Sequence, residues 1–577
     1  MMLKLFKHFK VNKILLGSLF VIILLKTVGT LYIPTLTADI INNGVIKGNI
    51  HYVLRTGGIM IGTAVFTGIL AIISTYFSSN LSSTLSRDIR SKIFSHAQEL
   101  SINDFKHFST SSLITRCTSD VNQIENTLTM FFEMIIPVPF ITLVGMFLAF
   151  SKDKYMALII SIAGTIFIIF IMLISKKVIN LSNKIQVGLD KINSRVRQYI
   201  SGIRIIRAFN REKHEKELID NAFTNYADIN VKLNKTFAIV MPAIMAIMNV
   251  CAVAVLWFGT IRISRGTMQV GDIMAVIEYA IIILVYLVMA VIVLINIPRA
   301  STCSRRILEV LQYKPEIVDE KVTEAISNNI KTLEFRNVTF SYKDAEKPVL
   351  KNVSFVCESG KTTAIIGATG SGKSTIGKLI PRLHEIQDGK ILINGVNTKY
   401  FSQKNLRDMI SFSPQKAFLF SGTIVDNIRH GKKDATINEI KSAAKMAQAD
   451  KFISELNLGY ESFVSQGGSN FSGGQRQRLC IARALIKDSD IYIFDDSFSA
   501  LDYKTDAKLR EAIKPRLKDS IVITIAQRIS TIMDADQIVV LEEGKIAGIG
   551  THTELLKSCP IYLKIAESQL SEEELVC

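Results

Sequence analysis

The sequence lacks the residue patterns that mark a disulfide-bonded or zinc-binding protein. Its seven cysteines are scattered along 577 residues, with no CxxC pair and no cluster of histidines. We therefore interpret them as reduced or buried residues. Acidic residues are fewer than basic ones: 51 Asp and Glu against 68 Lys and Arg give a formal net charge of +17. Hydrophobic residues reach 48 %, which excludes an intrinsically disordered chain.

Long apolar runs occupy only the first part of the chain. With a mean hydropathy of +0.29, the composition predicts several membrane spans. Six runs are each long enough to cross ~30 Å of hydrocarbon as a helix, near 14–36, 54–79, 127–150, 155–176, 236–262 and 274–297. After residue 320, short Val/Ile-rich strands alternate with helix-like stretches and Gly turns, which indicates an α/β fold.

This division predicts an α-helical membrane domain followed by an α/β domain. We expect an amphipathic surface helix at 1–12, a six-helix transmembrane domain at 13–315, a linker at 316–330 and the α/β domain at 331–577. The surface helix is predicted because Leu3, Phe6 and Phe9 would form an apolar stripe on one of its faces. The polar connections near 80–126 and 177–235 have helical patterning, so we expect membrane helices to continue beyond the bilayer.

The basic residues predict the orientation of the chain. Four lysines precede the first run, at positions 4, 7, 10 and 13, and both long polar connections are rich in Lys and Arg. A basic excess also occurs in nucleic-acid-binding proteins, but in a membrane protein it is typical of cytoplasmic loops. We therefore expect no nucleic acid as a partner. The prediction is a multi-pass protein of the cell membrane, with its N-terminus and its second domain in the cytoplasm.

A glycine-rich loop in the second domain predicts phosphate binding. The segment 364–375, AIIGATGSGKST, runs from a buried strand into the pattern GxxxxGKS, which is a P-loop. Its glycines let backbone N–H groups approach phosphate oxygens, and the next helix adds partial positive charge. The lysine would bridge the β- and γ-phosphates, and the serine after it would bind Mg²⁺. The candidate ATP-binding residues are Gly367, Ala368, Thr369, Gly370, Ser371, Gly372, Lys373, Ser374 and Thr375.

A second buried strand supplies a candidate Mg²⁺ carboxylate. The segment 491–496 reads IYIFDD, with four apolar residues before Asp495. Many buried strands end in Asp, so this pattern is weak alone. At this distance after a P-loop, it predicts the Mg²⁺-directing carboxylate of an ATPase.

The segment 471–478, FSGGQRQR, resembles the signature motif of ABC transporters, and the resemblance extends over essentially the whole chain. It implies an exporter half-transporter whose signature residues bind the ATP held by the opposite subunit's P-loop. The chain would then act as a dimer that hydrolyses ATP with Mg²⁺. The signature residues are Phe471, Ser472, Gly473, Gly474 and Gln475.

Further positions match the family one by one. Tyr342 is similar to the aromatic residue that stacks on adenine, and Gln415 to the glutamine that contacts Mg²⁺. Ser499 and Asp502 resemble the loop that crosses the dimer interface. The regions near 102–116 and 204–216 look like coupling helices, in which Phe105 and Phe209 would contact an ATPase domain. Taken singly, Tyr342 and Gln415 also fit a structural role, and the two coupling regions also fit ordinary amphipathic helices.

Two catalytic positions depart from the family pattern. Asp496 stands where an active enzyme has the Glu that polarises water, and Gln527 stands where it has the switch His. The Asp side chain is one methylene shorter, and Gln cannot become cationic. We interpret the pair as a degenerate ATP site in a heterodimer, whose partner supplies the Glu and the His. A slow homodimer is the alternative.

The sequence says little about the cargo. Lys26, Glu133 and Glu278 lie within predicted spans, where a charge needs a cavity or a partner. Glu278 is a candidate for binding cationic amphiphiles, although all three residues also fit interfacial or structural positions. The resemblance favours multidrug export of amphipathic compounds, in contact with membrane lipids. A lipid, peptide or siderophore transporter and a regulatory ATP-binding subunit stay open as alternatives.

Overall fold

The computed structural model describes residues 2–6, 9, 12–319, 330–343 and 345–570. They form two compact units. The first unit comprises the chain up to Gln98 together with Phe108–Tyr313, and the second comprises Glu99–His107 and the chain from Lys314 onward. The predicted surface helix (1–12) and linker (316–330) fall partly outside the described residues. A short helix α1 (Met2–Phe6) is present in the first of these segments.

Within the described residues, the first unit contains six helices that are long and apolar enough to cross a membrane, as predicted. Each is longer than its apolar run. α3 (Ile50–Glu99) has 50 residues, or ~75 Å, although its run ends near residue 79. The expected continuation of the helices beyond the apolar runs is therefore confirmed. The six spans are Lys13–Val45, Ile50–Glu99, Thr110–Lys152, Lys154–Ala208, Glu212–Ser264 and Val270–Leu311.

Two of the spans are built from several helical segments. The first is α2 (Lys13–Asp39), which continues as a π-helical segment η1 (Ile40–Val45). The third is composed of α5 (Thr110–Thr115), η2 (Arg116–Asp120), α6 (Val121–Met130), η3 (Phe131–Ile135) and α7 (Pro137–Lys152). Pro137, which has no backbone N–H to donate, lies where the π-helical segment η3 passes into α7.

The helices α2, α7 and α10 (Val270–Leu311) pack around a common apolar core. Tyr279 is fully buried there, and its hydroxyl lies 2.7 Å from that of Thr35. Gly271 allows α10 to approach α2 closely, because a Cβ at this position would lie 2.4 Å from the carbonyl oxygen of Ala38. Its N–H donates to Asn42 Oδ1 at 2.7 Å.

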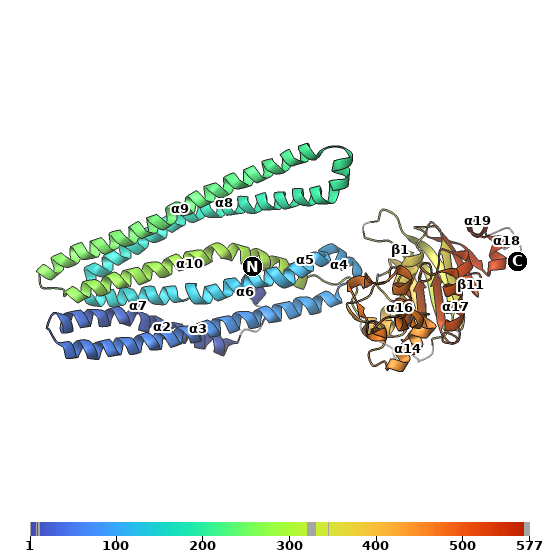
Figure 1. Cartoon of the computed structure of the whole chain (residues 1–577), viewed down its shortest axis with the longest axis horizontal. Coiled ribbons are helices and arrows are strands. Elements are labelled where there is room, and N and C mark those ends of the chain that lie inside the picture. Colours follow the sequence, from blue (N-terminus) through green and yellow to red (C-terminus); the bar gives the residue numbers. More distant parts are fainter. Residues whose placement is uncertain (1, 7–8, 10–11, 320–329, 344, 571–577) are drawn as a thin grey trace. The chain divides into compact units, whose positions relative to one another are not determined.

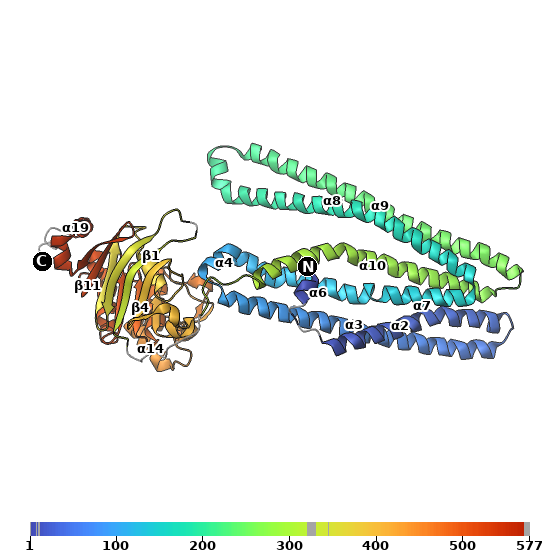
Figure 2. The ribbon, with the colours of Figure 1, turned by 180° about the vertical axis from the view of Figure 1, so that it is seen from behind.

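The remaining two spans form a long hairpin. α8 (Lys154–Ala208) and α9 (Glu212–Ser264) lie side by side, and both views show them diverging from the other helices toward the turn between them (Figures 1 and 2). The second predicted coupling region, 204–216, is this turn with its flanking helix ends. Phe209 lies in the turn and is 75 % exposed.

Ion pairs join α9 and α10 to the turn between α7 and α8. The guanidinium of Arg262, near the end of α9, donates to Asp153 Oδ2 at 2.7 and 3.0 Å. Asp153 also caps α8 by accepting from the N–H of Tyr155. Lys152 lies 3.0 Å from Asp272 on α10. These pairs fix the α7–α8 turn against α9 and α10.

The second unit contains two main sheets. The antiparallel sheet has the order β2-β1-β4-β5, and the six-stranded sheet has the order β12-β11-β3-β10-β9-β6, in which only β12 pairs antiparallel. The strands of these sheets are β1 (Thr332–Phe340), β2 (Leu350–Glu358), β3 (Thr362–Gly367), β4 (Asp388–Ile393), β5 (Val396–Asn397), β6 (Ile410–Ser413), β9 (Ile491–Asp495), β10 (Ile521–Ile525), β11 (Gln537–Glu542) and β12 (Lys545–Gly550). The expected α/β fold is thus observed.

Helices and short connections complete the second unit. A two-stranded ribbon pairs β7 (Gly422–Thr423) with β8 (Phe463–Val464). The helices are α4 (Ile102–Phe108), α11 (Lys373–Leu379), α12 (Gln403–Asp408), α13 (Ile424–Arg429), α14 (Ile437–Met446), α15 (Asp450–Ser454), α16 (Gly473–Leu485), α17 (Tyr503–Ile513), α18 (His552–Ser558) and α19 (Pro560–Glu567), with single 3₁₀ turns η4 (Thr398–Tyr400), η5 (Gly459–Glu461), η6 (Gln466–Gly468) and η7 (Ile529–Thr531). α4 belongs to this unit through His107, although it lies far upstream in the sequence.

We predict that Arg262→Met destabilises the first unit. The Asp153 side chain is only 4 % exposed, so the substitution leaves a buried carboxylate without its cationic partner. The free energy of unfolding should fall by about 1–3 kcal/mol, seen as a lower melting temperature in detergent. Arg265→Met is the matched control, because Arg265 is exposed one turn away. Equal melting temperatures for the two variants would contradict the prediction.

Candidate functional site

Four parallel strands bring the predicted catalytic residues to one edge of the six-stranded sheet. β3, β10, β9 and β6 are successive neighbours, and their carboxyl ends share that edge. The P-loop follows β3, Gln415 follows β6, Asp495 and Asp496 lie at the end of β9, and Gln527 follows β10. Ligands of open α/β sheets bind at this edge.

The P-loop has the backbone geometry of a phosphate cradle. Gly370 and Gly372 have φ angles of +85° and +100°, a region that residues with a Cβ rarely adopt. At Gly372 a Cβ would also lie 2.6 Å from Leu350. Lys373 begins α11, and its ammonium donates to the carbonyl oxygens of Gly367 and Ala368 at 2.7 and 2.8 Å. Burial lowers the pKa of Lys373.

Ser374 and Asp495 form the candidate Mg²⁺ site. The Ser374 hydroxyl donates to Asp495 Oδ1 at 2.7 Å, and Asp495 is only 1 % exposed. Burial raises the pKa of Asp495, and the hydrogen bond from Ser374 opposes this shift. The described residues contain no cluster of three or more His, Cys, Asp or Glu that would hold an ion unaided. A hydroxyl and one carboxylate nonetheless fit Mg²⁺, which keeps several waters and shares phosphate oxygens.

Asp496 is held by the two glutamines of the site. Its Oδ2 accepts a hydrogen bond from Gln527 Nε2 at 2.8 Å and another from Gln415 Nε2 at 3.2 Å. Its backbone is fixed as well, with a φ of +48° and an N–H that donates to the carbonyl oxygen of Ile525 at 2.8 Å. The three positions, up to 112 residues apart in sequence, therefore form a single hydrogen-bonded group.

Tyr342 lies in an aromatic group beside the P-loop helix. Its hydroxyl is 3.2 Å from that of Thr375, and its ring makes edge contacts with Phe340 and His384. The ammonium of Lys106, from α4, lies 5.5 Å from the centroid of the Tyr342 ring. Sequence reasoning missed Lys106 and His384, because neither belongs to a motif and only the fold brings them to Tyr342.

The first part of the first coupling region, up to His107 in α4, belongs to the second unit. The carboxylate of Asp104 is fully buried, and its Oδ2 accepts from the N–H groups of Ser101 and Glu316 at 2.9 and 3.1 Å. Asn103 donates to Glu316 at 3.4 Å. Phe105 is half-buried in the same unit. α4 is therefore fixed to this unit by its own hydrogen bonds, in addition to the contact that Lys106 makes with Tyr342.

The signature residues form the start of α16. Ser472 caps the helix: its Oγ accepts from the N–H of Gln475, whose side chain accepts from the N–H of Ser472. Phe471 is buried against Phe452. A Cβ at Gly473 would meet no atom within 4 Å, so the backbone there is open to a ligand. A helix N-terminus of this kind attracts anions.

The loop between β9 and α17 connects Asp496 to the next helix. The hydroxyl of Ser499 donates to the carbonyl oxygen of Asp496 at 2.9 Å. Gly474 at the start of α16 approaches the same loop, since a Cβ there would lie 3.2 Å from the carbonyl oxygen of Ala500. Asp502 caps α17 by accepting from the N–H of Thr505. Hydrogen bonding to the side chain and to the N–H of Thr505 lowers the pKa of Asp502.

The three charged residues predicted inside the spans are all half-buried in the first unit. Lys26 on α2 and Glu133 on η3 interact electrostatically. Glu278 lies on α10 one residue before the buried Tyr279. The attraction of Lys26 to Glu133 is the one interaction between the three residues that the described part of the chain shows.

The fold and the site define a multi-pass membrane protein joined to a P-loop ATPase domain. Comparison with known proteins agrees with this class. Residues 16–287 match the family described as ABC transporter transmembrane region, and residues 350–499 match the family described as ABC transporter. The chain belongs to the ABC transporter family and is an exporter half-transporter, with a membrane domain and an ATPase domain in one polypeptide.

Relatives match over nearly the full length. An uncharacterized ABC transporter ATP-binding protein of Mycobacterium tuberculosis is 36 % identical over 567 residues, covering 98 % of this chain and 97 % of the relative. The ATP-dependent lipid A-core flippase of Hahella chejuensis is 30 % identical over 524 residues, covering 89 % and 88 %. The structure of a bacterial Atm1-family ABC exporter with ATP bound superimposes with a TM-score of 0.81 over 97 % of this chain and 99 % of that one, at 24 % identity, and shows the shared fold.

We predict that Lys373→Met weakens ATP binding by the full-length chain. The ammonium is the charged donor in the P-loop, and loss of a charged hydrogen bond corresponds to roughly a tenfold to hundredfold weaker dissociation constant. Lys404→Met is the matched control, because Lys404 is an exposed lysine of α12. Binding of a fluorescent ATP analogue in detergent checks both variants, and equal affinities would contradict the assigned role of Lys373.

Proposed function

We propose that this chain is one half of a heterodimeric exporter and carries its degenerate ATP site. The observation that carries the proposal is the group of Gln415, Asp496 and Gln527. In an active site, the carboxylate at position 496 must accept a proton or a hydrogen bond from the attacking water. Here its Oδ2 already accepts from two side-chain amides.

The chemistry of the group supports nucleotide retention more than hydrolysis. Asp is one methylene shorter than Glu, and a misplacement of ~1 Å costs about a hundredfold in rate. Gln527 donates its amide to Asp496, so this amide hydrogen bond does not go to the γ-phosphate. Ser374 and Asp495 would still hold Mg²⁺, and Lys373 would still hold the phosphates. The site is therefore suited to binding ATP and poorly suited to cleaving it.

Exposed apolar residues support a partner chain. These residues lie in the α8–α9 hairpin, in the stretch 177–235 between its two apolar runs. We place this stretch outside the hydrocarbon. Val187, Ile200 and Ile205 are 66–68 % exposed. Apolar surface outside the bilayer marks a protein interface. A second half-transporter would cover this face, and Phe209 at the turn would then contact its ATPase domain.

The signature sequence supports the second part of the proposal, in which this chain completes the partner's ATP site. Ser472, Gly473 and Gly474 leave an open, capped helix start that would bind the ATP on the partner's P-loop. The partner would supply the Glu and the His for hydrolysis. ATP binding would close the two ATPase domains in the cytoplasm, and the membrane domains would turn outward because ATP binds the closed state more tightly.

For the cargo, we propose amphipathic compounds taken from the membrane or the cytoplasm. A second candidate is a lipid, because several relatives at 28–30 % identity are ATP-dependent lipid A-core flippases. Glu278 favours a cationic cargo, because an acidic side chain within a membrane span needs a cation or a cavity.

We predict that Asp496→Glu combined with Gln527→His increases ATP hydrolysis by the purified chain in lipid at least tenfold. The longer carboxylate reaches the water, and His supplies a group that can become cationic. Asp534→Glu adds the same methylene to an exposed carboxylate and is the matched control. If the unmodified chain already hydrolyses ATP as fast as the double variant, the assignment of a degenerate ATP site is wrong.

We predict that Glu278→Gln reduces transport of a cationic dye by about tenfold in vesicles that contain both half-transporters, the size expected for loss of one charged contact. Transport of a neutral compound of similar size serves as the control and should stay the same. Unchanged transport of the cationic dye would remove Glu278 from the cargo site.

A further inference from the structure

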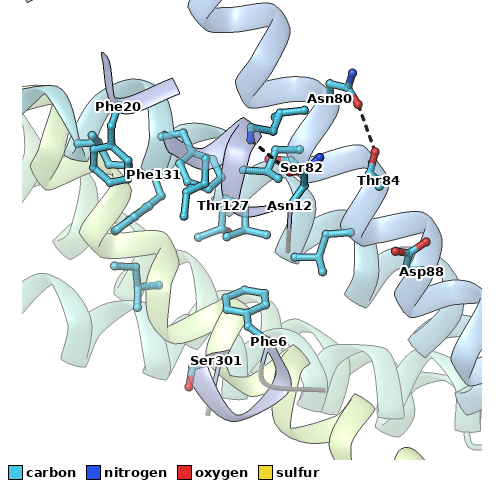
Figure 3. A pocket seen from close by; sticks show the side chains of 18 residues that line it. Phe6, Asn12, Phe20, Asn80, Ser82, Thr84, Asp88, Thr127, Phe131 and Ser301 are labelled. Atoms are coloured by element: carbon cyan, nitrogen blue, oxygen red, sulfur yellow. Dashed lines mark hydrogen bonds between the residues drawn. The ribbon is translucent and has the colours of Figure 1, made fainter. Parts of the chain in front are cut away.

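A cavity of about 870 Å³ lies in the first unit beside α1 (Figure 3). Its walls come from α1, the start of α2, the middle of α3, α6 with η3, and the end of α10. The volume is at the upper end of the range of small-molecule sites. None of its lining residues takes part in the nucleotide chemistry described above.

The cavity lies at the level where four apolar runs begin or end. Asn12 comes just before the first run, and Asn80 just after the second. Thr127 begins the third run, and Ile297 ends the sixth. Because these runs cross the hydrocarbon, the cavity lies at the boundary between the acyl chains and the headgroups of one leaflet.

The polar residues of the lining are concentrated on the headgroup side. On α3, beyond the end of the second run, polar residues (Asn80, Ser82, Thr84 and Asp88) are interspersed with Leu81 and Leu85, whereas Phe20, Phe131 and Phe132 lie on the hydrocarbon side. In Figure 3, the rings of Phe20 and Phe131 lie to one side of the space, with Asn80, Ser82 and Thr84 on another. Phe6 of α1 adds a ring of its own. The cavity is therefore amphipathic, as a membrane lipid is.

Ser82 supplies a polar group that the protein itself leaves unsatisfied. Its side chain is 1 % exposed, and its hydroxyl has no hydrogen-bond partner among the described residues. A buried hydroxyl without a partner is unfavourable, so an oxygen of a ligand in the cavity would be stabilised there.

The start of α2 supplies positive charge at the same level. Asn12 caps α2, and the first turn contains Lys13 and no acidic residue. The partial positive charge of a helix N-terminus favours an anionic group such as a phosphate. Asp88 also lines the cavity, but its carboxylate is paired with Arg87 at 2.8 Å.

We propose that this cavity binds one glycerophospholipid of the bilayer, with its phosphate and ester groups near Asn12 and Ser82 and an acyl chain along Phe20 and Phe131. The bound lipid fixes α1 against the helix bundle, because Phe6 contacts the same space. The site depends on membrane insertion and not on ATP or a partner chain. Its failure and the failure of the degenerate ATP site are therefore distinguishable.

Native mass spectrometry of the full-length chain, purified in a mild detergent and depleted of lipid, tests the proposal. Titration with a 16-carbon glycerophospholipid should show one saturable site. Leu16→Trp fills the cavity and should weaken binding at least tenfold, whereas Leu25→Trp, at an exposed position of α2 outside the cavity, should not. If Leu16→Trp prevents folding, Thr84→Phe fills the cavity from an exposed position.

A second pair of variants tests the headgroup contact. Ser82→Ala should weaken binding about fivefold, which corresponds to one neutral hydrogen bond. Ser78→Ala removes an equally buried, unpartnered hydroxyl on α3 that does not line the cavity, and it should have no effect. Excess inorganic phosphate should not compete. The proposal is overturned if the two tryptophan variants bind lipid equally, or if the two alanine substitutions have equal effects. It is also overturned if free phosphate competes with the lipid, or if the assembled dimer lacks the site.

Discussion

The alignment of β3, β10 and β9 in one parallel sheet is the constraint on which the ATPase site depends. β10 lies between the other two strands, so the loop after it comes between the P-loop and the end of β9. This places Gln527 within hydrogen-bonding distance of Asp496 and leaves Asp495 beside Ser374. A different strand order would separate these residues, whatever their identity. The chemistry of the site therefore depends on the strand order of the sheet as well as on the identity of each side chain.

Two neighbouring carboxylates at the end of β9 have different surroundings. Asp495 is buried, and its carboxylate accepts from a hydroxyl that would share Mg²⁺ with it. Asp496 accepts from two amides that cannot give up a proton at neutral pH. The first environment favours ion binding. The second fixes a carboxylate without preparing it as a base, which is why we place the weak point of catalysis at this residue.

The membrane half is organised by a different constraint, the burial of apolar helix faces. α2, α7 and α10 bury their faces in a core to which α8 and α9 also contribute residues. Toward the turn between them, α8 and α9 diverge from the other helices, and α8 retains exposed apolar residues beyond its apolar run (Figure 1). Exposure of apolar surface to water is unfavourable, and the proposed partner chain would cover this surface. The cavity beside α1 is a separate feature, because it lies within the bundle and needs only a lipid.

The six spans, the P-loop, the signature helix start and the two departures at Asp496 and Gln527 could all be predicted from the order of the residues. These features depend on the local order of residues, through hydrophobic runs, glycine geometry and capping, so they can be predicted without a fold. The folded structure was needed to show that Gln415 and Gln527 share one carboxylate oxygen and that Lys106 of α4 lies over Tyr342. It was also needed to show that residues of six helical segments line one cavity. Those contacts join residues that are distant in sequence. They are decided by strand order and helix packing, which no local pattern encodes.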